Sequence, residues 1–209
     1  QDYWTSGSNT YSLRQTAQNW TSVGNTITMY AHWLANKYTI SYNGNGATSG
    51  STENSSATYD QNVYIRPSGF FKIGYTFSSW NTASNGGGTR FNGGTTTASP
   101  PNLTAVNNGT ATLYAQWTEN HYVIRFDKNK PTRASSSVQG NMPDQTNLLW
   151  SGSYALNNNT FTLTGWTFKG WSLSPGDSNT VDYANAQTIC NKTDGRLPDN
   201  PDGTVTVLY

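Results

Sequence analysis

The stretch Ala111-Thr-Leu-Tyr-Ala-Gln-Trp117 is a short apolar segment that closes on a tyrosine and a tryptophan. It recurs upstream as Ile27-Thr-Met-Tyr-Ala-His-Trp33, and in a shortened form as Val205-Thr-Val-Leu-Tyr209. Apolar and polar positions alternate along it, which is the pattern of a half-buried strand. Three copies of one ending predict three copies of one structural unit.

The copies divide the 209 residues into three parts. Residues 1–33 are predicted to be the C-terminal part of a first repeat, and residues 34–117 a complete second repeat. Residues 118–209 are predicted to be a third repeat that is truncated before its final Ala-Gln-Trp. The segments Leu34–Lys37 and Thr118–His121 are read as four-residue joints, too short and too poor in glycine to act as floppy linkers.

Two further segments match between the second and third repeats. Tyr38–Tyr42 matches Tyr122–Phe126 at an offset of 84 residues, and Phe70–Trp80 matches Phe161–Trp171 at an offset of 91. The closing strands match at an offset of 95. Because the offset grows along the unit, the insertions are expected in loops while the strands stay fixed.

No segment has a convincing apolar period of 3.6 residues over three turns. Each unit is therefore expected to be mostly β, an α+β unit with at most one short helix, placed within Tyr59–Ile65 and Tyr154–Asn159. The aromatic residues that recur at matching places are predicted to form the core of each repeat. These repeat-core residues are Trp4, Tyr30, Trp33, Tyr38, Phe77, Trp80, Tyr114, Trp117, Tyr122, Phe168, Trp171 and Tyr209.

The composition excludes several classes of partner. Lys and Arg number 12 against 11 Asp and Glu, so there is no field of one sign to hold nucleic acid or an anionic membrane. No run of about 18 apolar residues exists, so membrane insertion is not expected. Cys190 is the only cysteine, which excludes an intrachain disulfide.

The sequence predicts no catalytic, cofactor or metal site. The aspartates of the third repeat have no matching carboxylates in the second, and solvated loop positions are the favoured reading over acid–base catalysis. His32 and His121 lack a second ligand at metal spacing, and Cys190 has no adjacent histidine motif. The loops Asn43–Gly46 and Pro175–Asp177 offer oxygens for calcium, but turn formation is their default role.

One family resemblance covers essentially the whole chain. The run Gly74-Tyr-Thr-Phe-Ser-Ser-Trp80, followed by Leu113-Tyr-Ala-Gln-Trp117, resembles the Listeria–Bacteroides repeat, also called the internalin B-type B repeat. The segment Gly165-Trp-Thr-Phe-Lys-Gly-Trp171 resembles it as well. Residues 1–33 lack the Gly-aromatic-Thr-Phe run. The resemblance implies a β-grasp, ubiquitin-like fold in each unit and tandem, extended arrays on secreted or wall-anchored bacterial surface proteins.

Two functions remain open at this stage. The first is a non-catalytic structural stalk or filament repeat of a bacterial cell-surface protein, which spaces or supports adhesion outside the cell. The second is an adhesin module that binds a glycan or a host surface protein. Aromatic residues outside the shared motif are the candidates for ligand contact in the second case: Trp20, Tyr64 and Trp150.

The partners expected first are neighbouring repeats or subunits of the same protein. Residues 1–33 lack opening strands, and Tyr209 stands inside a closing strand. Incomplete units expose sheet edges, which are rarely tolerated. We therefore expect either a window cut from a longer chain or a neighbouring subunit that completes the unit by strand addition.

Overall fold

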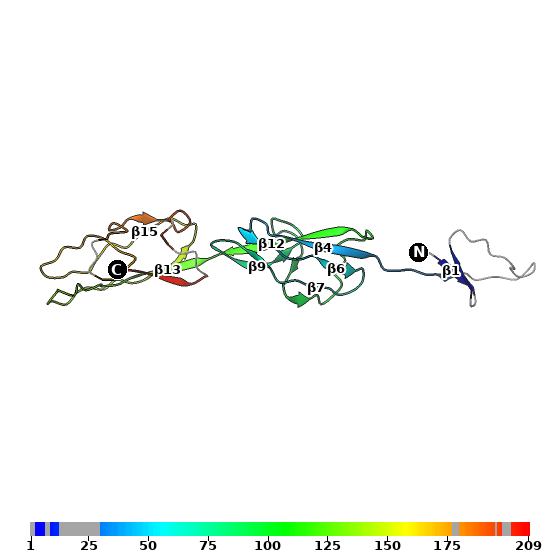
Figure 1. Cartoon of the computed structure of the whole chain (residues 1–209), viewed down its shortest axis with the longest axis horizontal. Coiled ribbons are helices and arrows are strands. Elements are labelled where there is room, and N and C mark those ends of the chain that lie inside the picture. The colour runs from blue at the N-terminus through cyan, green and yellow to red at the C-terminus, as the bar shows by residue number, and fades with distance from the viewer. Residues whose placement is uncertain (1–2, 7–8, 13–29, 177–179, 195, 198–201) are drawn as a thin grey trace, which may run out of the picture. The chain divides into compact units, whose positions relative to one another are not determined.

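The computed structural model of the chain describes residues 3–6, 9–12, 30–176, 180–194, 196–197 and 202–209. Every regular element in these residues is a strand, and Figure 1 shows arrows without a coiled ribbon. The expectation of a mostly β fold is thereby confirmed.

The short helices expected in two spans do not form. Tyr59–Ile65 is a turn that leads into strand β7 (Tyr64–Ile65), and Asp60 has a left-handed φ of 59°, which a right-handed helix does not accept. Tyr154–Asn159 begins with strand β15 (Tyr154–Ala155) and continues into a run of three asparagines, which are weak helix formers.

The contacts of the chain fall into two compact units. The first comprises residues 1–40, 55–64 and 96–111, and the second comprises residues 41–54, 65–95 and 112–209. Strands β4 (Lys37–Asn43) and β12 (Thr110–Glu119) contribute residues to both units.

In the first unit, β1 (Tyr3–Ser6) lies between β2 (Asn9–Ser12) and β3 (Tyr30–Ala31), and both pairings are antiparallel. The side chain of Trp4 lies outside the described part. Tyr30 and Trp33 are 63% and 91% exposed, which corrects their expected place in a repeat core. Their exposure follows from the pairing, because β3 is two residues long and only its contact with β1 holds it.

The second repeat (residues 34–117) forms a five-stranded sheet in the order β10-β9-β12-β4-β6. Its further strands are β6 (Ser55–Thr58), β9 (Tyr75–Asn81) and β10 (Arg90–Phe91). Two small sheets accompany it, one pairing β5 (Ser49–Gly50) with β8 (Phe70–Phe71) and one pairing β7 with β11 (Thr95–Thr96).

The first and last strands of the second repeat run parallel. The hydroxyls of Ser41 and Thr112 lie 2.9 Å apart, and the indole N–H of Trp117 donates to the carbonyl of Gly44 at 3.0 Å. The partner numbers rise together along the two strands, and strands that run antiparallel would show the opposite order.

The third repeat (residues 118–209) has the same parallel pair. Strand β13 (His121–Phe126) lies between β17 (Thr204–Leu208), which is parallel to it, and β14 (Gln145–Leu149), which is antiparallel. A small sheet of β15 and β16 (Thr188–Ile189) completes the described strands.

A cluster of aromatic rings surrounds Trp80, which is fully buried. Its ring centroid lies 4.7 Å from that of Tyr42, 6.2 Å from that of Phe70 and 5.0 Å from that of Phe77. The indole N–H of Trp80 also donates to the carbonyl of Arg66 at 2.8 Å. Tilted and edge-on ring pairs at these distances are the favourable arrangements.

The third repeat builds the same cluster around Trp171, which is 1% exposed. The ring-centroid distances are 4.8 Å to Phe126, 6.2 Å to Phe161 and 4.9 Å to Phe168. One difference stands out: the segment 166–170, which matches strand β9, forms no strand and carries only an isolated bridge at its end, between Trp171 and Tyr183.

Candidate functional site: the joint between the second and third repeats

A single residue connects the second repeat to the third. Strand β12 ends at Glu119 and β13 begins at His121, so Asn120 alone lies between them (Figure 1). The sequence suggested a joint of four residues, Thr118–His121, but three of these belong to strands. The residues of the joint that are discussed below all belong to the second compact unit.

Asn120 is buried and bonded to both repeats. Its backbone N–H donates to the carbonyl of Gly74 at 2.9 Å, and its side-chain oxygen accepts from the Thr76 hydroxyl at 2.7 Å. Its backbone carbonyl accepts from the N–H of Trp150 at 3.0 Å. Because buried polar groups must be hydrogen-bonded, these contacts fix Asn120 between β9 and the end of β14.

Trp150 packs against the second repeat beside this residue. Its ring lies edge-on to Tyr75, with centroids 5.9 Å apart and planes at 66°. Gly74 has a φ of +75°, and a Cβ placed on it would lie 2.0 Å from Cδ2 of Trp150. Glycine is thus required at position 74 both for its backbone conformation and for the approach of the indole.

Further polar contacts hold the ends of the joint. The N–H of Ser151 donates to the carboxylate of Glu119 at 2.7 Å. On β13, the N–H of His121 donates to Asp202 at 2.6 Å, and this bond lowers the pKa of the Asp202 carboxyl. The N–H of Gly203 donates to the carbonyl of His121 at 2.8 Å, which joins the residues before β17 to the start of β13.

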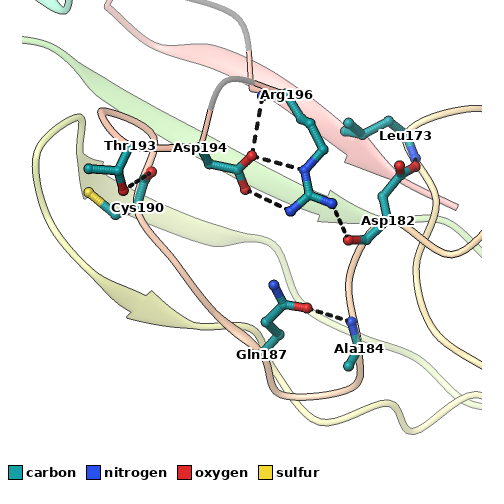
Figure 2. A network of polar contacts seen from close by, with 8 residues as sticks. All are labelled: Leu173, Asp182, Ala184, Gln187, Cys190, Thr193, Asp194 and Arg196. Carbon is teal, nitrogen blue, oxygen red and sulfur yellow. Dashed lines mark hydrogen bonds and ion pairs between the residues drawn. The ribbon is translucent and has the colours of Figure 1, made fainter.

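A polar network supports the loop that carries the backbone partner of Trp150 (Figure 2). Figure 2 shows the guanidinium of Arg196 between the Asp194 carboxylate, at 3.0 Å, and the backbone carbonyl of Asp182. The same guanidinium lies 4.4 Å from the ring centroid of Tyr183. The Asp182 carboxylate accepts the N–H of Leu173 at 2.8 Å.

Cys190, in the same loop, is engaged with the backbone. Its thiol donates to the carbonyl of Ser151 at 3.4 Å, and its own carbonyl accepts from the Thr193 hydroxyl at 3.3 Å. Burial acts to raise the pKa of the thiol, but hydrogen bonds from Thr193 and neighbouring residues outweigh it and lower the pKa. In the described part of the chain, no group of three or more His, Cys, Asp or Glu residues is placed to hold a metal ion.

The three candidates for ligand contact have different surroundings. Trp150 is half-buried in the joint, whereas Tyr64 on β7 is 52% exposed. Trp20 lies outside the described residues.

The repeat-core residues also differ in burial. Tyr38, Trp80, Tyr122 and Trp171 are buried, and Phe77, Tyr114, Trp117 and Tyr209 are half-buried. Phe168 is 37% exposed, because no strand lies over it.

Sequence reasoning missed the roles of Gly74, Glu119 and Asn120 at the joint. The Gly-aromatic pair at Gly74 carried a signal, since a glycine there suggested a sharp entry into the strand. Asn120 carried none, because asparagine is abundant throughout the chain and this one lies outside any repeated motif.

Comparisons with known proteins add a family and two relatives. Residues 38–116 match the family model of the Listeria–Bacteroides repeat domain. A protein of Evansella cellulosilytica named "Putative membrane protein" is 34% identical over 161 residues, which cover 75% of this chain and 22% of that protein. Another from the same organism, named "Putative Gly-rich membrane protein", is 33% identical over 113 residues, covering 53% of this chain and 12% of that protein.

The chain thus spans less than a quarter of either relative. No solved structure matches it. None of the described residues forms a helix long and apolar enough to cross a membrane. The family match covers both the Gly74–Trp80 run and the strand that ends at Trp117, and through residues 38–116 the chain belongs to the Listeria–Bacteroides repeat family.

Proposed function

We propose that this chain is a non-catalytic structural segment of a bacterial cell-surface protein, whose repeats hold other parts of that protein at a set distance from the envelope. The repeat family supports this role, and so do the two relatives, both named as membrane proteins. An extracellular position and a part in adhesion belong to the same proposal.

Each repeat in this proposal is a small β-grasp unit. The parallel pairing of first and last strands supports the assignment, because β13 and β17 are paired over Tyr122–Phe126 and Thr204–Leu208. The second repeat has the equivalent pair in β4 and β12. In both repeats a sheet carries a buried tryptophan within a ring of aromatic side chains.

The observation that carries the proposal is the joint. A spacer must transmit position, and a Gly/Ser-rich linker would behave as a random coil. Here one buried residue, Asn120, separates two strands and is bonded to Gly74 and Thr76 on one side and to Trp150 on the other. The clustered polar groups of the third repeat also serve structure, since Asp182 and Asp194 bind the backbone and Arg196.

The test is whether the two repeats tumble together. Backbone ¹⁵N relaxation of the full chain should give one shared rotational correlation time for residues of the second and third repeats. A matched control carries several Gly-Ser residues inserted after Asn120, and it should give two shorter, separate correlation times. If the unmodified chain already behaves like the control, the spacer role is wrong.

The adhesin alternative predicts a different result. Tyr64 is the ligand candidate that the structure leaves exposed, at 52%. A glycan array probed with the full chain would favour the binding module if it gave saturable binding that Tyr64→Ala abolished. Uniform silence would favour the spacer.

A further inference from the structure

The largest difference between the two repeats is a cavity at one place in the third. In the second repeat, Trp117 lies edge-on to Phe77, with centroids 5.9 Å apart, and its indole N–H donates to the carbonyl of Gly44. The repeat offsets place Phe168 at the position of Phe77 and Lys128 at the position of Gly44. Between them the third repeat has a cavity of about 530 Å³, lined by Lys128, Phe168, Trp171 and Tyr209 among others.

The backbone beside this cavity has the geometry of an open sheet edge. Tyr209 and Ser172 exchange two backbone hydrogen bonds, of 2.7 and 2.8 Å, just as their counterparts Tyr114 and Asn81 are paired in the second repeat. There the next pairs are Ala115 with Trp80, Gln116 with Ser79 and Trp117 with Phe77.

No residue takes these places in the third repeat. Within the described part of the chain, the backbone groups of Thr167, Phe168, Lys169 and Gly170 make no hydrogen bond. The third repeat therefore presents a slot one strand wide, with free donors and acceptors along its edge and a socket for one large aromatic ring. Adding a strand at such an edge is a recognised mode of peptide binding.

The same chain carries a segment that fits the slot. Tyr30-Ala-His-Trp33 repeats the pattern of Tyr114-Ala-Gln-Trp117, so Ala31 to Trp33 are the residues that would follow a tyrosine in the position of Tyr209. Trp33 is 91% exposed, and no strand is formed by residues 32–36. An exposed tryptophan of this kind is a typical anchor for an interface.

We infer that the slot beside residues 167–170 binds the Ala31–Trp33 segment of a second copy of this chain, with Trp33 in the socket that Trp117 fills in the second repeat. Ala31 lies opposite Trp171, His32 opposite Gly170 and Trp33 opposite Phe168. The contact joins the third repeat of one copy to the first repeat of the next. It is independent of how stiff the joint at Asn120 is.

Sedimentation velocity of the full chain over a wide range of concentrations tests this inference. The unmodified chain should associate, and Trp33→Ala should weaken the association by roughly 30-fold or more, the loss typical of a tryptophan at the centre of an interface. Because Trp33 is exposed, its removal leaves the fold intact. Tyr64→Ala, which truncates another exposed aromatic side chain, is the matched control and should leave the association unchanged.

A second variant fills the slot from within the same chain. It carries a copy of residues 115–119, Ala-Gln-Trp-Thr-Glu, after Tyr209, and it should stay monomeric. Mixed together, this extended chain and the Trp33→Ala chain should form a one-to-one complex and nothing larger, because one supplies the only free donor and the other the only free slot.

Three outcomes would overturn the inference. These are an unmodified chain that stays monomeric at every concentration, an association that Trp33→Ala leaves intact, and an extended chain that self-associates as strongly as the unmodified one.

Discussion

Replacing Trp150 with alanine should loosen the joint while leaving both repeats folded. The indole is half-buried, and about half of the ~250 Å² that a tryptophan can bury, at ~25 cal/mol per Å², corresponds to ~3 kcal/mol. The edge-on pair with Tyr75 adds about 0.5–1.5 kcal/mol. Since ~1.4 kcal/mol is a factor of ten, the ratio of closed to open joints should fall by roughly two orders of magnitude or more.

Pulsed electron–electron spin resonance measures this opening directly. Spin labels on Thr95→Cys and Ser137→Cys, both exposed sites, report the distance between the two repeats. Cys190→Ser removes the native thiol and keeps a donor to the Ser151 carbonyl. The parent should give one narrow distance distribution and Trp150→Ala a broad one.

Two controls make the result decisive. Trp166→Ala removes a tryptophan of the same repeat that is 45% exposed and makes no ring contact with Tyr75, so its distribution should stay narrow. Far-ultraviolet circular dichroism should show unchanged strand content in Trp150→Ala, because Trp150 lies outside the buried cluster around Trp171. An equally narrow distribution in Trp150→Ala would refute the reasoning.

Three more changes test the account. Gly74→Ala should broaden the same distance distribution and cost ~1 kcal/mol or more in urea unfolding, because position 74 has a φ of +75° and a Cβ there meets Trp150. Trp80→Phe should cost ~1–3 kcal/mol more than Trp171→Phe in urea unfolding, because only Trp80 loses an indole hydrogen bond, to the carbonyl of Arg66, whereas the indole N–H of Trp171 is without a partner among the described residues. Partial burial acts to raise the pKa of Asp194, but its bonds to Arg196 outweigh this and hold the pKa below its ordinary 3.8. The stabilisation is thus present above pH 3.8 and lost as pH falls through the lower folded-state value, so melting curves should show Asp194→Asn with a weaker acid-induced loss of stability than the unmodified chain.

The aromatic clusters were the most predictable part of this fold. Trp80 and Trp171 recur in one motif, and a repeated motif predicts a repeated environment; both are buried, among rings at nearly equal distances. Such large side chains dominate a small core, so their spacing alone carries the signal.

Strands made of polar residues were not predictable in this way. Strand β6 is Ser-Ser-Ala-Thr, which the sequence suggested was loop, and it exists because β4 pairs with it from Lys37 to Ile40. The reverse holds for residues 166–170, whose sequence matches β9 and which form no strand because no partner lies beside them. Strand formation in both cases is decided by the neighbour, which a local pattern does not contain.

The joint depended on the same kind of information. Trp150 was suggested as a ligand contact because it lies outside the repeated motif, and an isolated aromatic residue carries no sign of what it faces. Its role is set by Gly74 and Tyr75, more than seventy residues earlier in the chain.

The parallel pairing of first and last strands also decides how a repeat responds to tension. A pull applied at the start of β13 and the end of β17 draws these strands in opposite directions along their shared edge, where Tyr122–Phe126 lie opposite Thr204–Leu208. The hydrogen bonds between the strands then carry the load together, as in a lap joint under shear, whereas a hairpin pulled from its open end breaks its bonds one after another. A segment built of such units hardly lengthens as force rises, until a whole strand pair gives way at once.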